Sequence, residues 1–175
     1  MFSRAPVGTR VNLTVYAPNL ISEQEDRPLA GYAALAAGYA AFFAGGLALA
    51  IRRDRELPER IGVADIALYG VATHRLSRML SREKLGRLVR LPFTEVDEDI
   101  PTPPGELAEH PREGGSMRRA VGELVSCTLC LDQWVAGGFV VAHVAAPRAT
   151  RAVAAALTIK AAADVLHIGY ARAVT

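Results

Sequence analysis

Residues 30–51 contain no charged side chain, and this apolar block constrains the fold more than any other feature of the chain. A helix of about 20 apolar residues, rising about 1.5 Å per residue, crosses a hydrocarbon core of about 30 Å. Glu23, Glu25 and Asp26 precede the block, where a secretory signal peptide would carry a basic segment. The block therefore predicts a membrane-spanning helix that is not cleaved off.

Three further apolar blocks follow this one. Residues 124–146 and 152–171 are long enough to span a membrane, and Pro147 separates them. These two blocks are expected to form an antiparallel helical hairpin. Residues 61–80 form a weaker block that contains Asp65 and ends in basic side chains, so it is expected either to span the membrane or to enter it only partly.

The segments between the blocks are rich in Pro, Gly and acidic residues, which bury too little apolar surface to become ordered. Residues 1–29 and 95–116 are of this kind and are expected to be mobile. The resulting fold class is an all-α integral membrane helical bundle with three or four transmembrane helices. A mobile N-terminal tail precedes the helix at 30–51, and a membrane domain at 60–172 contains the remaining helices and a loop.

Lys and Arg in short loops set the orientation of a membrane protein. If residues 61–80 span, the chain crosses four times and both termini lie inside. If they only enter the membrane, the chain crosses three times and the N-terminus lies outside. Both arrangements place the loop at 95–116 and the following cysteine pair on the cytoplasmic side of the plasma membrane.

Residues 73–90 alternate apolar and basic side chains. This basic amphipathic pattern is typical of a helix end among lipid headgroups, and it also fits a recognition surface for anionic lipid. The arginines expected at headgroups are Arg75, Arg78, Arg82 and Arg87. Nucleic acid is not expected as a partner, because the net charge is only +2 and no aromatic platform interleaves the basic residues.

Cys127 and Cys130 form a Cys-x-x-Cys pair at the start of an apolar stretch. Four roles are open for it: structural packing, metal binding, thiol–disulfide exchange, and lipidation or another modification. Two cysteines do not complete a tetrahedral metal shell, so zinc or iron would need His74, Asp132 or Glu123, or the same pair from a second chain. Otherwise no cofactor is expected.

Lys160, Asp164 and His167 follow helical spacing inside an apolar block, so they share one stripe of the last helix. Charged groups at this depth are costly and are expected to face the bundle interior, where Asp65 or Tyr69 joins them. The stripe is either a functional site or a buried ion pair that fixes helix register. Small residues at Ala37, Ala41 and Gly45 suggest a helix-packing face on the first helix.

Four motifs in this order resemble one known family: DIALYGVATHRLSR at 65–78, RLPF at 90–93, GELVSCTLCLDQW at 122–134 and ADVLHIGYA at 163–171. The chain resembles domain-of-unknown-function family 1360, which consists of small bacterial multi-pass membrane proteins and includes a sporulation protein. The resemblance implies that the helix at 30–51 is an N-terminal addition. The family usually has Cys-Pro-Phe-Cys where Thr128 and Leu129 stand here, which weakens the case for a tuned redox site. No catalytic residue transfers.

The chain has no nucleophile motif and no Gly-rich phosphate loop, so the sequence does not point to an enzyme. The expected function is that of a non-enzymatic membrane component acting through lipid or protein contacts. Its expected partners are membrane lipids, a second copy of the chain or another membrane protein. The alternative is a membrane thiol-redox or metal-binding protein that uses Cys127 and Cys130.

Overall fold

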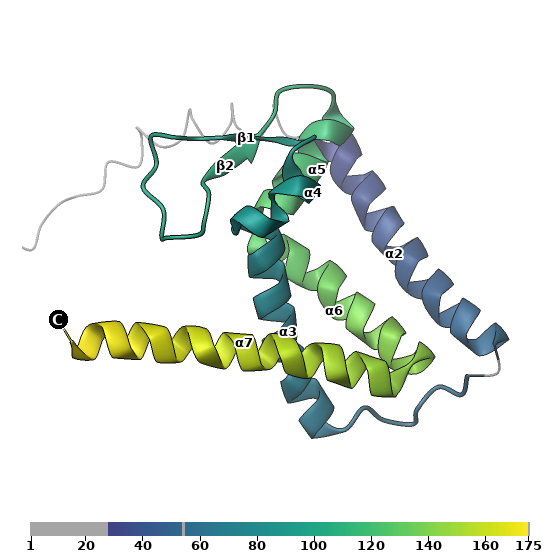
Figure 1. Ribbon diagram of the computed structural model, residues 1–175. Coiled ribbons are helices and arrows are strands. Elements are labelled where there is room, and N and C mark those ends of the chain that lie inside the picture. The colour runs from purple at the N-terminus through teal and green to yellow at the C-terminus, as the bar shows by residue number, and fades with distance from the viewer. Residues whose placement is uncertain (1–27, 54, 175) are drawn as a thin grey trace, which may run out of the picture.

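The structure, a computed structural model, describes residues 28–53 and 55–174 (Figure 1). These residues are mostly helical, and the predicted all-α fold class is confirmed. The predicted tail at 1–29 lies outside the described residues except for Pro28 and Leu29. In chain order the elements are α2 (Leu29–Arg52), α3 (Val63–Ser81), the 3-10 helix η1 (Lys84–Gly86), α4 (Arg87–Arg90), β1 (Thr94–Val96), β2 (Glu109–Pro111), α5 (Ser116–Ser126), α6 (Thr128–Ala145) and α7 (Pro147–Ala173).

Three of the helices, α2, α6 and α7, are long and apolar enough to cross a membrane. Their outer faces present large apolar side chains that no other part of the chain covers, such as Leu49 at 51% exposure and Ile159 at 70%. Apolar surface on this scale marks contact with lipid or with another chain. The chain is therefore an integral membrane protein.

α3 is the central helix of the bundle and packs against α6 and α7. Its Tyr69 and Ala72 form the core with Phe139 of α6 and Ala154 of α7. The rings of Tyr69 and Phe139 stack with their centroids 5.4 Å apart, and the Tyr69 hydroxyl lies 2.7 Å from Nδ1 of His143. α3 lies beside α6 and is crossed by α7, whereas α2 packs against α5 and α6 (Figure 1).

α7 crosses α3 obliquely, and its C-terminal half projects beyond the bundle (Figure 1). The predicted break at Pro147 is confirmed, because this proline occupies the first turn of α7, where its missing N–H costs nothing. The expected hairpin with α6 does not persist along the two helices. Contacts with α3 hold α7 instead, including a hydrogen bond of 3.3 Å from Thr158 Oγ1 to the carbonyl of Leu68.

The apolar block predicted as one helix at 124–146 consists of two helices that meet at Cys127. This residue has extended backbone angles, φ −105° and ψ 110°, and it is both the C-cap of α5 and the N-cap of α6. Its sulfur accepts a hydrogen bond of 3.3 Å from the N–H of Cys130, as N-cap side chains do. The span therefore begins at Thr128, and Leu124 belongs to the preceding helix.

Residues 95–116, expected as a loop, take part in a short antiparallel strand pair. Thr94 pairs with Pro111, Glu95 with His110 and Val96 with Glu109. Further backbone hydrogen bonds fasten the segment to the end of α3, from Leu107 N–H to the Arg82 carbonyl at 2.8 Å and from Lys84 N–H to the Gly105 carbonyl at 2.9 Å. The mobility of the segment stays a prediction. We call residues 82–126 the charged cap.

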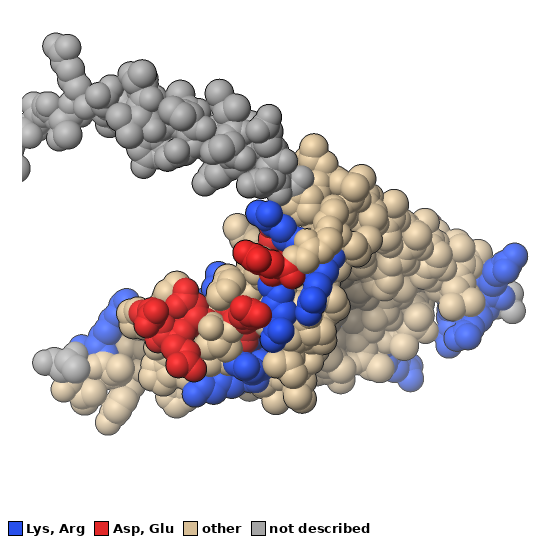
Figure 2. Space-filling model, turned by 90° about the horizontal axis from the view of Figure 1, so that it is seen from above, with Lys and Arg blue, Asp and Glu red and all other residues tan. Residues whose placement is uncertain are grey.

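Charged side chains gather at the two ends of the molecule. Seen from above, acidic and basic groups cover the charged cap, and a separate basic group lies at the far end of α2, where Arg52 and Arg53 are exposed (Figure 2). The surface between the two groups is largely uncharged (Figure 2). This distribution suits a bundle that crosses a membrane between two aqueous sides.

The face of α2 that packs is not the predicted one. Ala37, Ala41 and Gly45 are exposed, while Gly31 is buried against α5. A Cβ on Gly31 would lie 2.5 Å from the carbonyl oxygen of Ser116, so only glycine allows this approach. The small residues of α2 surround the helix, and the sequence pattern did not identify which of them contact a neighbour.

Gly31→Ala is expected to destabilise the packing of α2 by about 1–3 kcal/mol, because the added methyl group overpacks the contact with α5. Gly45→Ala is the matched control, since a Cβ there meets nothing within 4 Å. Thermal unfolding in mild detergent, followed by the fluorescence of Trp134, measures both variants. Trp134 reports on α2 because its ring lies 5.5 Å from that of Tyr39. Equal melting temperatures for the two variants would contradict the prediction.

Candidate functional site: the charged cap and its dithiol

The charged cap is built around one fully buried arginine. Arg90 has no solvent exposure, and it forms an ion pair with Glu109, whose side chain is 2% exposed. Its Nε donates to Glu109 Oε2 at 2.8 Å and its Nη2 to Oε1 at 3.0 Å. Nη1 donates to the carbonyl oxygens of Leu80 at 2.5 Å and Glu83 at 3.1 Å. One guanidinium therefore joins the end of α3, α4 and β2.

Thr94 completes the surroundings of the Glu109 carboxylate by donating a hydrogen bond of 2.5 Å from its hydroxyl group. Burial acts to raise the pKa of Glu109, but the hydrogen bonds from Arg90 and Thr94 and the charge of Arg90 hold this pKa below its ordinary value. The carboxylate is thus kept ionised inside the cap. Its role is structural, because it is enclosed by its own partners.

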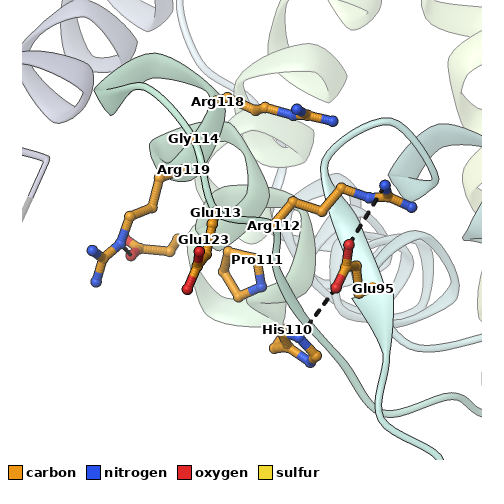
Figure 3. Close-up of a pocket in the computed structure, with 9 residues that line it drawn as sticks. All are labelled: Glu95, His110, Pro111, Arg112, Glu113, Gly114, Arg118, Arg119 and Glu123. Atoms are coloured by element: carbon orange, nitrogen blue, oxygen red, sulfur yellow. Dashed lines mark hydrogen bonds and ion pairs between the residues drawn. The ribbon is translucent and has the colours of Figure 1, made fainter.

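A cavity with a volume of about 840 Å³ opens on the surface of the charged cap beside this pair (Figure 3). Its walls come from β1, β2, the turn after β2 and α5, and they carry charges of both signs. The lining residues are Glu95, His110, Pro111, Arg112, Glu113, Gly114, Arg118, Arg119 and Glu123. A cavity of this kind suits a polar ligand or a charged segment of another protein, not an apolar molecule.

Interactions among the lining residues hold the cavity open. Glu95 lies 3.5 Å from Arg112 and 3.8 Å from His110, and both pairs are visible in Figure 3. Arg119 pairs with Glu123 at 3.2 Å on α5. These groups are partly exposed, so their mutual attraction contributes little to stability. They remain able to exchange partners with an incoming charged group.

The structure separates the four arginines predicted to contact lipid headgroups. Arg75 is 5% exposed and pairs with Glu83 at 2.6 Å and with Asp164 at 3.1 Å, so it stabilises the bundle and does not reach the surface. Arg78 pairs with Glu106 at 2.5 Å. Arg82 and Arg87 form no ion pair with any residue that the structure describes. The basic surface is therefore smaller than the sequence pattern indicated.

An exposed apolar strip lies beside the two unpaired arginines. It belongs to η1 and α4, where Leu85 is 71% exposed, Leu88 82% and Val89 55%. Arg82 and Lys84 are also exposed at this edge of the cap. Short segments with apolar side chains on one side and basic ones on the other lie at the boundary between headgroups and acyl chains. Residues 82–91, which we call the interfacial segment, have this composition.

Cys127 and Cys130 lie together at the first turn of α6, and both are free thiols. Their sulfur atoms are 2.6 Å apart. Cys130 is exposed and Cys127 partly exposed. A hydrogen bond of 2.7 Å between the hydroxyl groups of Ser81 and Thr128 ties this turn to the end of α3. The dithiol is thus fixed where the charged cap meets the membrane helices.

The other residues predicted to join the dithiol do not form a metal shell with it. Within residues 28–53 and 55–174, no three His, Cys, Asp or Glu side chains are grouped so that they could hold a metal ion. His74 lies on an exposed position of α3. A metal bound between the pairs of two chains stays a prediction.

Asp132 belongs to the interface between α3 and α6. These helices are antiparallel, and Ser81 contacts Thr128, so the residues one turn further on, Ser77 and Asp132, occupy the same interface. Ser77 Oγ and Asp132 Oδ1 are both buried, and neither has a hydrogen-bond partner among the residues described. Unsatisfied buried oxygens cost about 1–3 kcal/mol each. This is a polar site inside the bundle, separate from the thiols.

The predicted polar stripe on α7 is divided. Lys160 and His167 are exposed, so the expectation that the stripe faces the bundle interior is wrong for both. Asp164 pairs with Lys160 on the same helix and with Arg75 of α3. Asp65 does not join this group as expected. It accepts two hydrogen bonds of 2.7 Å from Arg151 at the start of α7.

Tyr69 was the other residue expected to join the stripe, and its hydroxyl contacts His143 of α6 instead. Within the stripe, Asp164 attaches α7 to α3 through Arg75, whereas Lys160 pairs with Asp164 on the same helix. This arrangement favours the role of ion pairs in helix register.

The family comparison agrees with this architecture. A family described as "Protein of unknown function (DUF1360)" matches residues 68–170. The chain belongs to the DUF1360 family. The match begins within α3 and ends within α7, so the DUF1360 domain includes the charged cap, the dithiol and the ion pair between Arg75 and Asp164, while α2 lies outside it. Comparison with curated proteins and with solved structures found no match.

Sequence reasoning missed the central pair of the DUF1360 domain. The RLPF motif contains Arg90, but nothing in the sequence identified Glu109 as its partner. Strands of three residues are too short for a convincing alternation of apolar and polar side chains. The proline-rich stretch between the strands also favoured a loop.

Arg90→Gln is expected to destabilise the charged cap by about 3–5 kcal/mol, because it leaves the Glu109 carboxylate buried without its counter-ion. Lys84→Gln is the control, since Lys84 is exposed and forms no ion pair among the described residues, so this change should alter stability by less than about 0.5 kcal/mol. Hydrogen exchange at the backbone amides of Asp97 and Leu107, which bond across the cap, measures the effect. Similar exchange in both variants would refute the central role of Arg90.

The stability of the cap is also expected to depend on acidity. The pKa of Glu109 is lower in the folded state than its ordinary value of 4.5, so its contribution is present above that value. The contribution is lost as pH falls through the folded pKa, because protonation removes the charge that Arg90 needs. The protection factors of the amides in the strand pair, which account for the slower intrinsic exchange in acid, should therefore fall below about pH 4.5. This fall in protection should be absent in Glu109→Gln, and its persistence there would assign it to another group.

Proposed function

We propose that this DUF1360 protein is a non-enzymatic component of the plasma membrane that contacts lipid headgroups, and a partner protein, through its charged cap on the cytoplasmic side. The basic residues of the cap support this orientation under the positive-inside rule. The observation that carries the proposal is the interfacial segment. Its exposed Leu85 and Leu88 have no partner within the described chain, and Arg82 and Arg87 beside them are free of ion pairs.

A bilayer surface explains why exposed leucines and arginines without ion pairs lie side by side in the interfacial segment. Exposed leucines in water would be unfavourable, whereas burial of apolar area contributes about 25 cal/mol per Å². Arginines at the same level reach phosphate groups, and each basic residue near an anionic surface contributes about 1 kcal/mol. The cavity on the other side of the cap, lined by charges of both signs, is the surface proposed for a protein partner, which includes a second copy of the chain.

Neutralising Arg82 and Arg87 together is expected to lower the preference of the protein for anionic lipid by roughly tenfold. The measurement is the ratio of phosphatidylglycerol to phosphatidylcholine retained by the full chain after extraction from mixed bilayers, determined by native mass spectrometry. The control, Arg118→Gln with Arg119→Gln, removes the same charge from the cavity wall. An equal loss in both double variants would show that net charge, not the interfacial segment, determines the preference.

A dithiol function is the second candidate, and a specific contact favours it. The sulfur atoms of Cys127 and Cys130 are 2.6 Å apart, whereas a disulfide bond requires about 2.05 Å. Oxidation of this pair therefore needs only a small movement at the start of α6. Zinc or iron at the pair would require further ligands from outside residues 28–53 and 55–174, such as the matching pair of a second chain.

A further inference from the structure

We infer that the dithiol exchanges with a disulfide presented at the membrane surface, with Cys127 as the attacking sulfur and Cys130 as the resolving thiol. This inference rests on the second function proposed above, that the pair is redox active. It adds the order of attack and the class of substrate. The hydrogen bonds of the first turn of α6 carry the argument.

The first turn of α6 distinguishes the two sulfurs. Cys127 Sγ is the N-cap acceptor of this helix and accepts a hydrogen bond of 3.3 Å from the N–H of Cys130, whose own sulfur lies 2.6 Å away. A sulfur that accepts a backbone N–H at the N-terminus of a helix carries negative charge at a lower cost. The thiolate is the nucleophile in disulfide exchange, so the geometry assigns attack to Cys127.

The surroundings of the pair leave it accessible and well positioned. Cys130 is exposed, and the neighbouring Leu129 is 81% exposed, so no side chain of the described residues closes over the thiols. The hydrogen bond between Ser81 and Thr128 holds the first turn of α6 against α3. The pair lies where the charged cap meets the apolar helices, so a disulfide that reaches it must be at the membrane surface.

The exchange balances in two steps. The Cys127 thiolate attacks one sulfur of the substrate disulfide, forming a mixed disulfide and releasing the other sulfur as a thiolate that takes up a proton. Cys130 then loses its proton to water and attacks Cys127 Sγ, forming the internal disulfide and releasing the second substrate thiol. Two electrons pass from the dithiol to the substrate disulfide.

The test uses oxidised glutathione as the probe and the full chain in lipid nanodiscs. Intact mass spectrometry after acid quenching follows the wild type, Cys130→Ser and Cys127→Ser. The wild type is expected to form the internal disulfide with no lasting adduct. Cys130→Ser should accumulate the glutathione adduct on Cys127, and Cys127→Ser should react about tenfold more slowly. After unfolding in denaturant, the two single variants should react at equal rates.

The outcomes separate the order of attack from the redox function itself. An internal disulfide in the wild type, together with equal rates or the reverse order in the folded single variants, overturns the assignment of Cys127 as nucleophile. The absence of an internal disulfide in the wild type overturns the dithiol function as a whole. A difference between the variants that persists after unfolding shows that the fold is not its cause, which also overturns the assignment.

Discussion

The buried ion pair between Arg90 and Glu109 determines where the charged cap sits. Removing two charges from water is costly, and the cost is offset only when every hydrogen-bonding group around them is in place. Here those groups come from the end of α3, from the segment after it and from both strands. A displacement of any one of them leaves a charge unsatisfied. This arrangement therefore also fixes the positions of the cavity and of the interfacial segment.

Inside the bundle, polar contacts have a comparable role for α7. Arg151 binds Asp65 near the start of α3, and Arg75 further along α3 contacts Asp164. In each pair one partner is well covered, Asp65 at 15% and Arg75 at 6% side-chain exposure, so loss of the other partner would leave that charge unsatisfied. The two pairs explain why α7 crosses α3 and departs from α6, although only a break at Pro147 separates it from α6. Apolar packing alone would not select this direction.

The sequence predicted what depends on local composition. Apolar blocks identified the long helices, and Pro147 identified the break between the last two, because both signals act within a few residues. The sequence did not show which of several similar residues is buried. Arg75 and Arg82 belong to the same basic amphipathic stretch, yet Arg75 is buried and paired with Glu83 and Asp164, whereas Arg82 is exposed.

The division of the block at 124–146 was also missed, because Leu124 and Val125 continue its apolar character up to Cys127. Similarly, Gly31 and Gly45 differ only in what lies opposite them. Which glycine is buried depends on the element that packs opposite it. That element is distant along the chain, so the local sequence around the glycine does not reveal the contact. The pairing of Arg90 with Glu109 is the clearest case, since neither residue is notable until the strands bring them together.

The junction at Cys127 has a mechanical consequence. α5 ends and α6 begins on either side of this one residue, with no intervening loop. The φ and ψ angles of a single residue therefore set the tilt of α5 relative to the membrane helix that follows. A covalent change at this sulfur acts at the pivot between the two helices, so the orientation of the extramembrane part is sensitive to the chemical state of one atom.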